Sequence, residues 1–421
     1  MQEVERFHSE DTELPAYSQI RNTSTSSRTQ HSYHLSKSGK KWLTVSVQSR
    51  ATDPQEIPNF AQGHTISGSV GLDLANEAVI RAVSVSVVGD LLSSDDIMRF
   101  LTINQVLAVS DMNELDQDGV RTGHPQPATY NGKLQGKYSW PFEIRLPKGV
   151  SIVLDNCRSN YQLPPSFQHS SSRARVEYHI VVRVKKGVLS SNHRLLIPFI
   201  FTQRARPSQP SILRQISYLE QTPLVGPEGD PDGWKTLDSV QIQGTFFRTR
   251  PIEATCTLSL ARPLCYTQGA VIPLILSISS EDSHALDLLS TPSAPCVQLL
   301  RRGSFSASVS LSTIRLIGPW DSQDEVIGSA TWWCAPAAQS AYDTKVLHGE
   351  IRIPPDAIPN CRILHFELEY WLSMMHFRAI SFTPDDPPPK ACLISEKIQI
   401  VTVHAEGPQH IAYSPPSYAS T

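Results

Sequence analysis

The sequence predicts an all-β protein made of two tandem immunoglobulin-like antiparallel β-sandwiches with disordered N- and C-terminal tails. Three observations support this prediction: apolar and polar residues alternate in short runs, turn-forming residues separate these runs, and two short motifs occur twice in the same order. The chain has 421 residues, a length that commonly divides into two or three domains, each with its own core.

Changes in composition mark the expected domain boundaries. Residues 1–40 are rich in Ser, Thr, Gln and His and show no regular apolar period, so we expect a disordered N-terminal tail. Residues 41–205 and 241–405 carry the alternating runs and are expected to form the two sandwiches. Residues 206–240, rich in Pro, Gly and Ser, are predicted to be a linker, and residues 406–421 a disordered tail.

Alternation identifies individual strands. From Val176 to Val184 apolar side chains occupy every second position, although Val181 departs from the rule. Similar runs cover residues 83–87, 142–146, 272–278 and 364–372. By contrast, the spacing of the apolar residues between Ile97 and Val109 predicts one short helix.

Two motifs occur once in each half of the chain. Gln62–Ile66 is similar to Gln268–Ile272, and Glu143–Pro147 is similar to Glu350–Pro354, at nearly the same separation. One match could arise by chance, whereas two matches at one spacing indicate a duplicated unit. In each copy we expect the Gln-Gly pair to form a turn entering a strand and the Pro to end a strand.

Charge and composition argue against several classes of protein. The 37 basic and 40 acidic residues give a formal net charge of -3, which provides no general attraction for nucleic acid. The apolar runs are too short for a transmembrane helix, and the charged segment Met1–Arg6 does not resemble a signal peptide, so the sequence predicts a cytoplasmic protein. The seven cysteines are scattered, without a Cys-x-x-Cys pair, and we expect small buried apolar residues rather than disulfides or metal ligands.

Sequence signatures of enzymes were not found. The chain has no GxSxG elbow, no HExxH motif, no glycine-rich phosphate loop and no set of kinase motifs. The 14 histidines form no cluster with the spacing of metal ligands. We therefore expect neither catalytic activity nor a cofactor.

Five segments of the first half follow the order and spacing of a known family. They are Gly63–Val70, Ile80–Gly89, Gly136–Pro147, Leu163–Phe167 and Arg175–Ile180. This pattern resembles the N-terminal domain of the α-arrestins, also called arrestin-related trafficking adaptors, and Leu260–Leu274 is similar to the opening of the arrestin C-terminal domain. The resemblance implies the arrestin fold and a scaffold that binds cytosolic segments of membrane transporters or receptors. Such binding would bring the protein to the plasma membrane and endosomes as a peripheral partner of its cargo.

The C-terminal residues Pro415, Pro416, Ser417 and Tyr418 form a PPxY motif. Two prolines pre-form a polyproline II helix that fits the aromatic groove of a WW domain, and the tyrosine fills a second pocket. In arrestin-like adaptors such motifs recruit HECT-type ubiquitin ligases, so the resemblance implies the same partner here. The alternative is a Pro-rich terminus without a partner.

Two further candidate sites have weaker support. Leu14, Pro15 and Tyr17 form an LPxY variant of the same ligand, which could add avidity for tandem WW domains or have no partner. Adaptors of the family are often ubiquitinated in their N-terminal domain, so the resemblance makes Lys185 and Lys186 candidate acceptors. Otherwise these lysines would simply form a solvated strand end.

Three functions therefore remain open at the level of sequence. The resemblance implies an adaptor that recruits a ubiquitin ligase to membrane transporters or receptors and promotes their ubiquitin-dependent endocytosis and sorting. A second reading is an arrestin-fold scaffold in signalling or endosomal sorting without ligase coupling. A third, an enzyme built on β-sandwiches, would require a pocket with convergent titratable groups.

Overall fold

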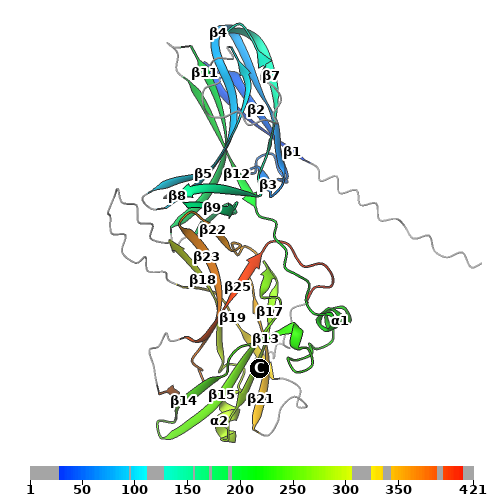
Figure 1. Cartoon of the computed structure of the whole chain (residues 1–421), viewed down its shortest axis with the longest axis vertical. Coiled ribbons are helices and arrows are strands. Elements are labelled where there is room, and N and C mark those ends of the chain that lie inside the picture. Colours follow the sequence, from blue (N-terminus) through cyan, green and yellow to red (C-terminus); the bar gives the residue numbers. More distant parts are fainter. Residues whose placement is uncertain are drawn as a thin grey trace, which may run out of the picture.

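The computed structural model of the chain is elongated, with the first half of the sequence at one end and the second half at the other (Figure 1). The structure describes residues 28–93, 96–110, 128–154, 157–169, 173–187, 192–305, 324–334, 343–385 and 392–410. Strands dominate both halves of this part of the chain, which confirms the predicted all-β class.

The first half contains strands β1 to β12 within the described residues. Their bounds are Thr29–Lys37 (β1), Lys40–Ser49 (β2), Asn59–Ala61 (β3), Thr65–Leu92 (β4), Ile97–Val109 (β5), Ala128–Thr129 (β6), Lys133–Arg145 (β7), Gly149–Leu154 (β8), Cys157–Gln162 (β9), Phe167–His169 (β10), Ala174–Lys186 (β11) and His193–Thr202 (β12).

The long strand β4 belongs to both layers of the first half. Its first part pairs with β2 and β7 in the layer β1-β2-β4-β7, and its second part pairs with β5 and β11 in the layer β5-β4-β11-β12-β3. The pairing with β7 is irregular between Leu74 and Ala78, where the strand passes from one layer to the other. Val45 and Val70 of one layer and Val85 of the other are fully buried in the same apolar cluster, which gives a sandwich-like core.

The second half contains two α-helices, one 3-10 helix and strands β13 to β25 within the described residues. Their bounds are Ile212–Glu220 (α1), Pro231–Gly233 (η2), Trp234–Thr236 (β13), Val240–Phe246 (β14), Arg250–Ala261 (β15), Cys265–Thr267 (β16), Val271–Ser279 (β17), Ser283–Leu289 (α2), Cys296–Phe305 (β18), Glu325–Ser329 (β19), Thr331–Cys334 (β20), Thr344–Arg352 (β21), Cys361–Ile363 (β22), Phe366–Met375 (β23), Phe382–Pro384 (β24) and Cys392–Val401 (β25).

The second half repeats the strand order of the first half. The order β14-β15-β17-β21 matches β1-β2-β4-β7, and β19-β18-β23-β25-β16 matches β5-β4-β11-β12-β3. In both halves the last of these pairs is parallel, β12 with β3 and β25 with β16. The one long strand β4 corresponds to two strands, β17 and β18, with α2 between them. The duplication predicted from two short motifs is therefore visible in the strand pairing.

The repeated Gln-Gly motif forms the same turn in both halves. Gly63 and Gly269 have positive φ angles of 80° and 74°, a backbone conformation that favours glycine. After each glycine the next N–H closes the turn, from His64 to the Ala61 carbonyl at 3.0 Å and from Ala270 to the Thr267 carbonyl at 3.1 Å. The expectation that these residues lead into a strand is confirmed by β4 and β17, which follow directly.

Strand β1 corrects the prediction for the N-terminal segment. Residues 29–37 pair with β2 along their whole length, so the prediction of disorder is wrong for this part. The inward residue His31 is fully buried, with Nδ1 3.0 Å from the Pro54 carbonyl oxygen and Nε2 2.8 Å from Ser49 Oγ. Because a histidine counts as polar in a hydropathy pattern, the alternation of His31, Tyr33 and Leu35 was not evident from the sequence.

The helix predicted between Ile97 and Val109 is also wrong. These residues form β5, which pairs antiparallel with β4. The register shifts twice along this pair, between Gly89 and Asp90 and again between Val83 and Ser84. Each shift moves the apolar positions out of strict alternation, which produced a spacing similar to that of a helix.

The segment predicted to be a linker contains regular structure. Residues 206–240 include α1, η2 and β13, and β13 pairs with β15 of the second half. The cysteines also differ in part from the prediction. Cys256, Cys296 and Cys361 are buried as expected, whereas Cys334 and Cys392 are exposed, so the prediction of burial is wrong for these two.

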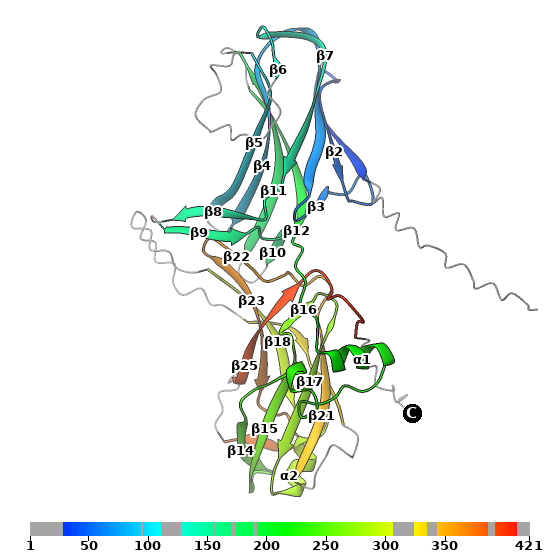
Figure 2. The same ribbon diagram turned by 45° about the vertical axis from the view of Figure 1, so that its right-hand side comes forward.

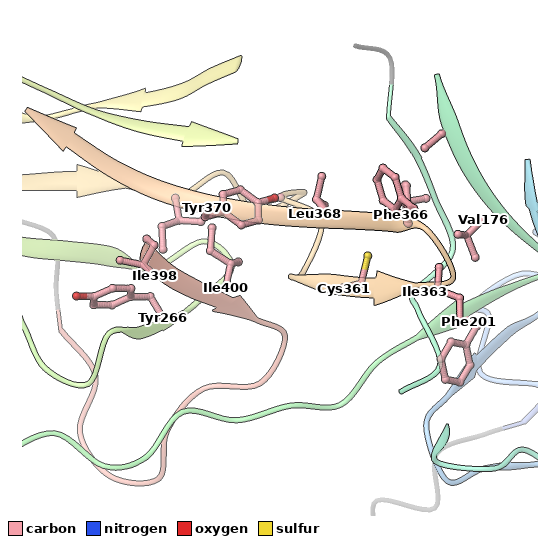
Figure 3. Close-up of a cluster of buried hydrophobic side chains, with 14 of the residues drawn as sticks. Val176, Phe201, Tyr266, Cys361, Ile363, Phe366, Leu368, Tyr370, Ile398 and Ile400 are labelled. Atoms are coloured by element: carbon pink, nitrogen blue, oxygen red, sulfur yellow. The ribbon is translucent and has the colours of Figure 1, made fainter. Parts of the chain in front are cut away.

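The cores of the two halves are joined by a small apolar contact (Figure 3). The rings of Phe167 in β10 and Phe366 in β23 lie 5.5 Å apart. Figure 3 shows Val176 from the first half beside Ile363 and Phe366 from the second. The apolar contact therefore fixes β10 and β11 against β22 and β23.

A cluster of His169, Glu325 and Arg301 lies next to Phe167 of this apolar contact. His169, at the end of β10, is 1% exposed, and its Nε2 lies 3.7 Å from Glu325 Oε2 in β19. Arg301 in β18 donates a hydrogen bond to the same carboxylate oxygen at 2.8 Å. Burial lowers the pKa of His169, and the neighbouring Arg301 lowers it further, while Glu325 acts in the opposite direction.

Candidate anion-binding site

A basic pocket of about 270 Å³ opens where β1, β2 and the β3–β4 turn meet. Its lining residues are Arg28, Gln48, Ser49, Arg50, Phe60, Gly63, His64 and Thr65. Phe60 is buried in the core and supports the base of the pocket, while polar and basic side chains form the rest of the lining. The pocket therefore differs from the mostly apolar cavities that bind drug-sized ligands.

Backbone hydrogen bonds hold the pocket residues in place. The N–H of Arg50, directly after β2, donates to the Asn59 carbonyl at 3.2 Å. The N–H of Arg204, two residues after the end of β12, donates to Oε1 of the Gln62 side chain at 3.2 Å. Because Gln62 belongs to the turn that carries His64, segments from β2, β3 and β12 are fixed around the same opening.

The electrostatic environment of His64 shows that positive charge converges on the pocket. Burial lowers the pKa of His64, and three arginines lower this pKa further. These are Arg50, Arg204 and Arg28, in decreasing order of effect. The Ala61 N–H donates to Nδ1 of His64 at 3.2 Å, so in the neutral ring the proton is on Nε2.

The three arginines have side chains available for a ligand. Within the described residues, no acidic side chain forms an ion pair with Arg28, Arg50 or Arg204. A guanidinium group presents several N–H donors in one plane and binds carboxylate or phosphate oxygens in pairs. The pocket can therefore bind an anionic group through several guanidinium donors and the Nε2–H of His64.

Other kinds of site have little support in the described residues. No group of three or more His, Cys, Asp or Glu side chains there is arranged to hold a metal ion. In the same part of the chain, neither α-helix has the length and apolar character required to cross a bilayer.

The two candidate ubiquitin acceptors differ in their surroundings. Both lysines lie within β11, which extends two residues beyond the predicted run. Lys185 is exposed, whereas the Nζ of Lys186 lies 4.8 Å from the ring centroid of Trp42. Burial lowers the pKa of Lys186, and the nearby Lys37 lowers it further. Of the two, Lys185 presents the more accessible amine.

The two predicted WW-domain ligands lie outside the described residues. This applies to Pro415, Pro416 and Tyr418 and equally to the Leu14-Pro15-Ala16-Tyr17 segment. The basic pocket, in turn, was not predicted from the sequence. Its arginines and His64 are far apart along the chain, and only the Gln-Gly turn marked this region in advance.

Comparison with known proteins finds no matching family model and no matching curated protein. The similarity to α-arrestins therefore rests on the sequence segments named above. Strand order, pocket and motifs are the observations from which a function has to be argued.

Proposed function

We propose that this protein is an adaptor of the α-arrestin type that recruits a HECT-type ubiquitin ligase to membrane transporters or receptors. In this proposal Pro415, Pro416 and Tyr418 bind a WW domain of the ligase. The sandwich-like halves bind the cytosolic segment of the cargo, which is then ubiquitinated, endocytosed and sorted. The protein acts in the cytoplasm and reaches the plasma membrane and endosomes through its cargo.

The observation that carries the cargo-binding part is the basic pocket. Its guanidinium groups have no acidic partner among the described side chains, and they lie near enough to His64 to lower the pKa of this histidine. Such an arrangement favours a peptide with acidic or phosphorylated residues. Ser49 of the lining is 2% exposed, and its Oγ is bonded to His31 Nε2 and to the Ala51 N–H, so this hydroxyl is not presented to a ligand and the pocket residues support binding rather than catalysis.

The ligase-binding part is tested by the affinity of the full chain for an isolated WW domain of a HECT-type ligase. Tyr418→Ala is expected to weaken binding at least tenfold because the tyrosine fills one of the two pockets of the WW domain. Ser420→Ala is the control, since it alters a residue of the same segment outside the motif. Equal affinity for the two variants, or no binding by the unmodified chain, would contradict ligase recruitment through this motif.

A scaffold without ligase coupling is the second candidate function. It is favoured by the location of the basic pocket in the first half, on elements that are separate from the PPxY motif. In cells, cargo turnover that is unaffected by Tyr418→Ala but impaired by Arg50→Ala would support this function. Loss of turnover in both variants would support the ligase adaptor.

A further inference from the structure

Helix α1 exposes its four aliphatic side chains and buries two polar ones, Arg214 and Ser217. Ile212 and Leu219 are 75% and 74% exposed, and Leu213 and Ile216 are each 43% exposed. Arg214, by contrast, is 3% exposed. A surface helix normally has the opposite orientation, with its apolar face toward the core.

A buried arginine explains this orientation. The Arg214 guanidinium donates hydrogen bonds to the carbonyl oxygens of Arg262, at 2.7 Å, and of Gly233. It also lies 4.6 Å from the ring of Trp234. Because a buried charge is costly without such partners, these contacts fix the rotation of the helix about its axis. The apolar face of α1 therefore cannot turn toward the core.

The cap of the helix supports the same orientation. The Oγ of Ser211 accepts a hydrogen bond from the Arg214 N–H at 3.3 Å and donates to Asp230 Oδ2 at 2.5 Å. Asp230 is itself buried and also accepts from the Gly233 N–H at 3.1 Å. Four aliphatic side chains are thus held together on the surface by a polar network beneath them. An apolar patch of this kind commonly marks an interaction surface.

The chain itself passes along the edge of this apolar face. Figures 1 and 2 both show the segment after β25 running beside α1 (Figure 2). Gly407 lies against Gln215 of α1, so closely that an added Cβ atom would be 3.4 Å from Gln215 Oε1. Three residues later, the ring centroid of His410 is 5.0 Å from that of Tyr218. At about 100° per residue, Gln215 lies between Tyr218 and Leu219 around the helix. Gly407 therefore lies near the border of the exposed apolar face, and the residues after His410 start beside Tyr218, about 100° around the helix from Leu219.

Residues 411–421 have suitable length and chemistry to cover this face. Residues 411–421 carry no charged side chain, and Ile411, Tyr413, Pro415 and Pro416 are apolar or aromatic. The nine-residue helix α1 is about 14 Å long. An extended chain spans about 3.3 Å per residue, so four or five extended residues reach from one end of α1 to the other. A membrane is a poorer fit, because Arg214 is buried and no other basic residue lies in α1, which ends at Glu220.

We propose that residues 411–416 dock on the apolar face of α1 formed by Ile212, Leu213, Ile216 and Leu219. His410 anchors the start of this segment, since its Nε2 lies 2.5 Å from Glu350 Oε1. The short connection gives the segment a high effective concentration at the helix. Docking holds Pro415 and Pro416 against the protein. If the motif recruits a WW domain, as proposed above, α1 and the WW domain compete for the same prolines.

The test is hydrogen–deuterium exchange of the full chain, read by mass spectrometry at the amides of residues 411–414 and 417–421. Ile216→Glu and Leu219→Glu are expected to accelerate exchange of these amides at least threefold. Ile380→Glu is the matched control, because Ile380 is 80% exposed and lies outside α1. Unchanged exchange in β17 and β23 verifies that the helix variants keep their fold.

Equal exchange of the C-terminal amides in all variants would overturn the proposal. If protection of the amides from exchange depends on protein concentration, a second copy of the chain covers α1 and the proposal is wrong. If α1 is protected only when vesicles of anionic phospholipid are added, a membrane covers α1 and the proposal is also wrong. A parallel titration with an isolated WW domain separates the two proposals. Faster exchange in Ile216→Glu with several-fold tighter WW binding supports both, whereas faster exchange without any WW binding supports docking and contradicts ligase recruitment.

Discussion

Replacing Arg50 by Ala is expected to weaken binding of an acidic or phosphorylated peptide about fivefold. Arg50 is exposed, so its contact with an anion is screened by water and contributes about 1 kcal/mol, which corresponds to about fivefold in Kd. Arg204→Ala is expected to cause a loss of similar size, because both arginines act on His64 at the same opening. The double variant should bind more weakly than either single variant.

Salt and pH should change this affinity in a defined direction. The contacts are between exposed charges, so affinity falls as the ionic strength rises. Burial and the arginines lower the pKa of His64, which keeps its ring neutral near pH 7. A bound phosphate or carboxylate offsets the positive charges and raises the pKa of His64. Proton uptake by His64 is then coupled to binding, so the affinity for a carboxylate peptide rises as the pH falls through the raised pKa of His64.

Fluorescence polarisation with a labelled phosphoserine peptide measures these effects, and the same peptide with unmodified serine reports the contribution of the phosphate. Arg378→Ala is the control, because Arg378 is an exposed arginine in the second half of the chain. The reasoning would be refuted if Arg50→Ala and Arg378→Ala bound the phosphopeptide equally well. Affinity that does not respond to salt would refute it as well.

Three further predictions concern stability, measured by unfolding in denaturant. Phe366→Ala removes a fully buried ring at the contact between the halves and should cost about 3–5 kcal/mol, whereas Phe247→Ala, at a side chain 61% exposed, should cost much less. Gly349→Ala places a methyl group into the ring of Trp332 and should cost about 1–3 kcal/mol; no loss would mean that this ring can move aside. Burial lowers the pKa of His169 in the folded protein. Below pH about 6.5 the unfolded chain therefore binds more protons than the folded protein, and the free energy of unfolding should decrease as the pH is lowered. His169→Gln should reduce this dependence, and an unchanged pH profile would exclude His169 as its source.

Local patterns in the sequence were sufficient for the fold class. Alternation over Val176–Val184 depends only on the geometry of a strand, and these residues form the centre of β11. The Gln-Gly motif depends on a positive φ angle, and Gly63 and Gly269 both adopt one. Where a local pattern was disturbed, the prediction failed. A buried histidine at position 31 hid β1, and two register shifts made β5 look helical.

The sequence by itself thus determined the strand content, the repeat and the presence of a PPxY motif, since each depends on neighbouring residues. Only the tertiary structure decided where charge and apolar surface gather. Arg28, Arg50 and His64 line one basic pocket, and Arg204 lies near enough to act on His64, because β2, β3 and β12 end at the same opening. Likewise, α1 exposes Ile216 and Leu219 because Arg214 is bound by carbonyl groups from distant segments. A linear pattern does not contain these contacts, because they depend on how the strands pair across the chain.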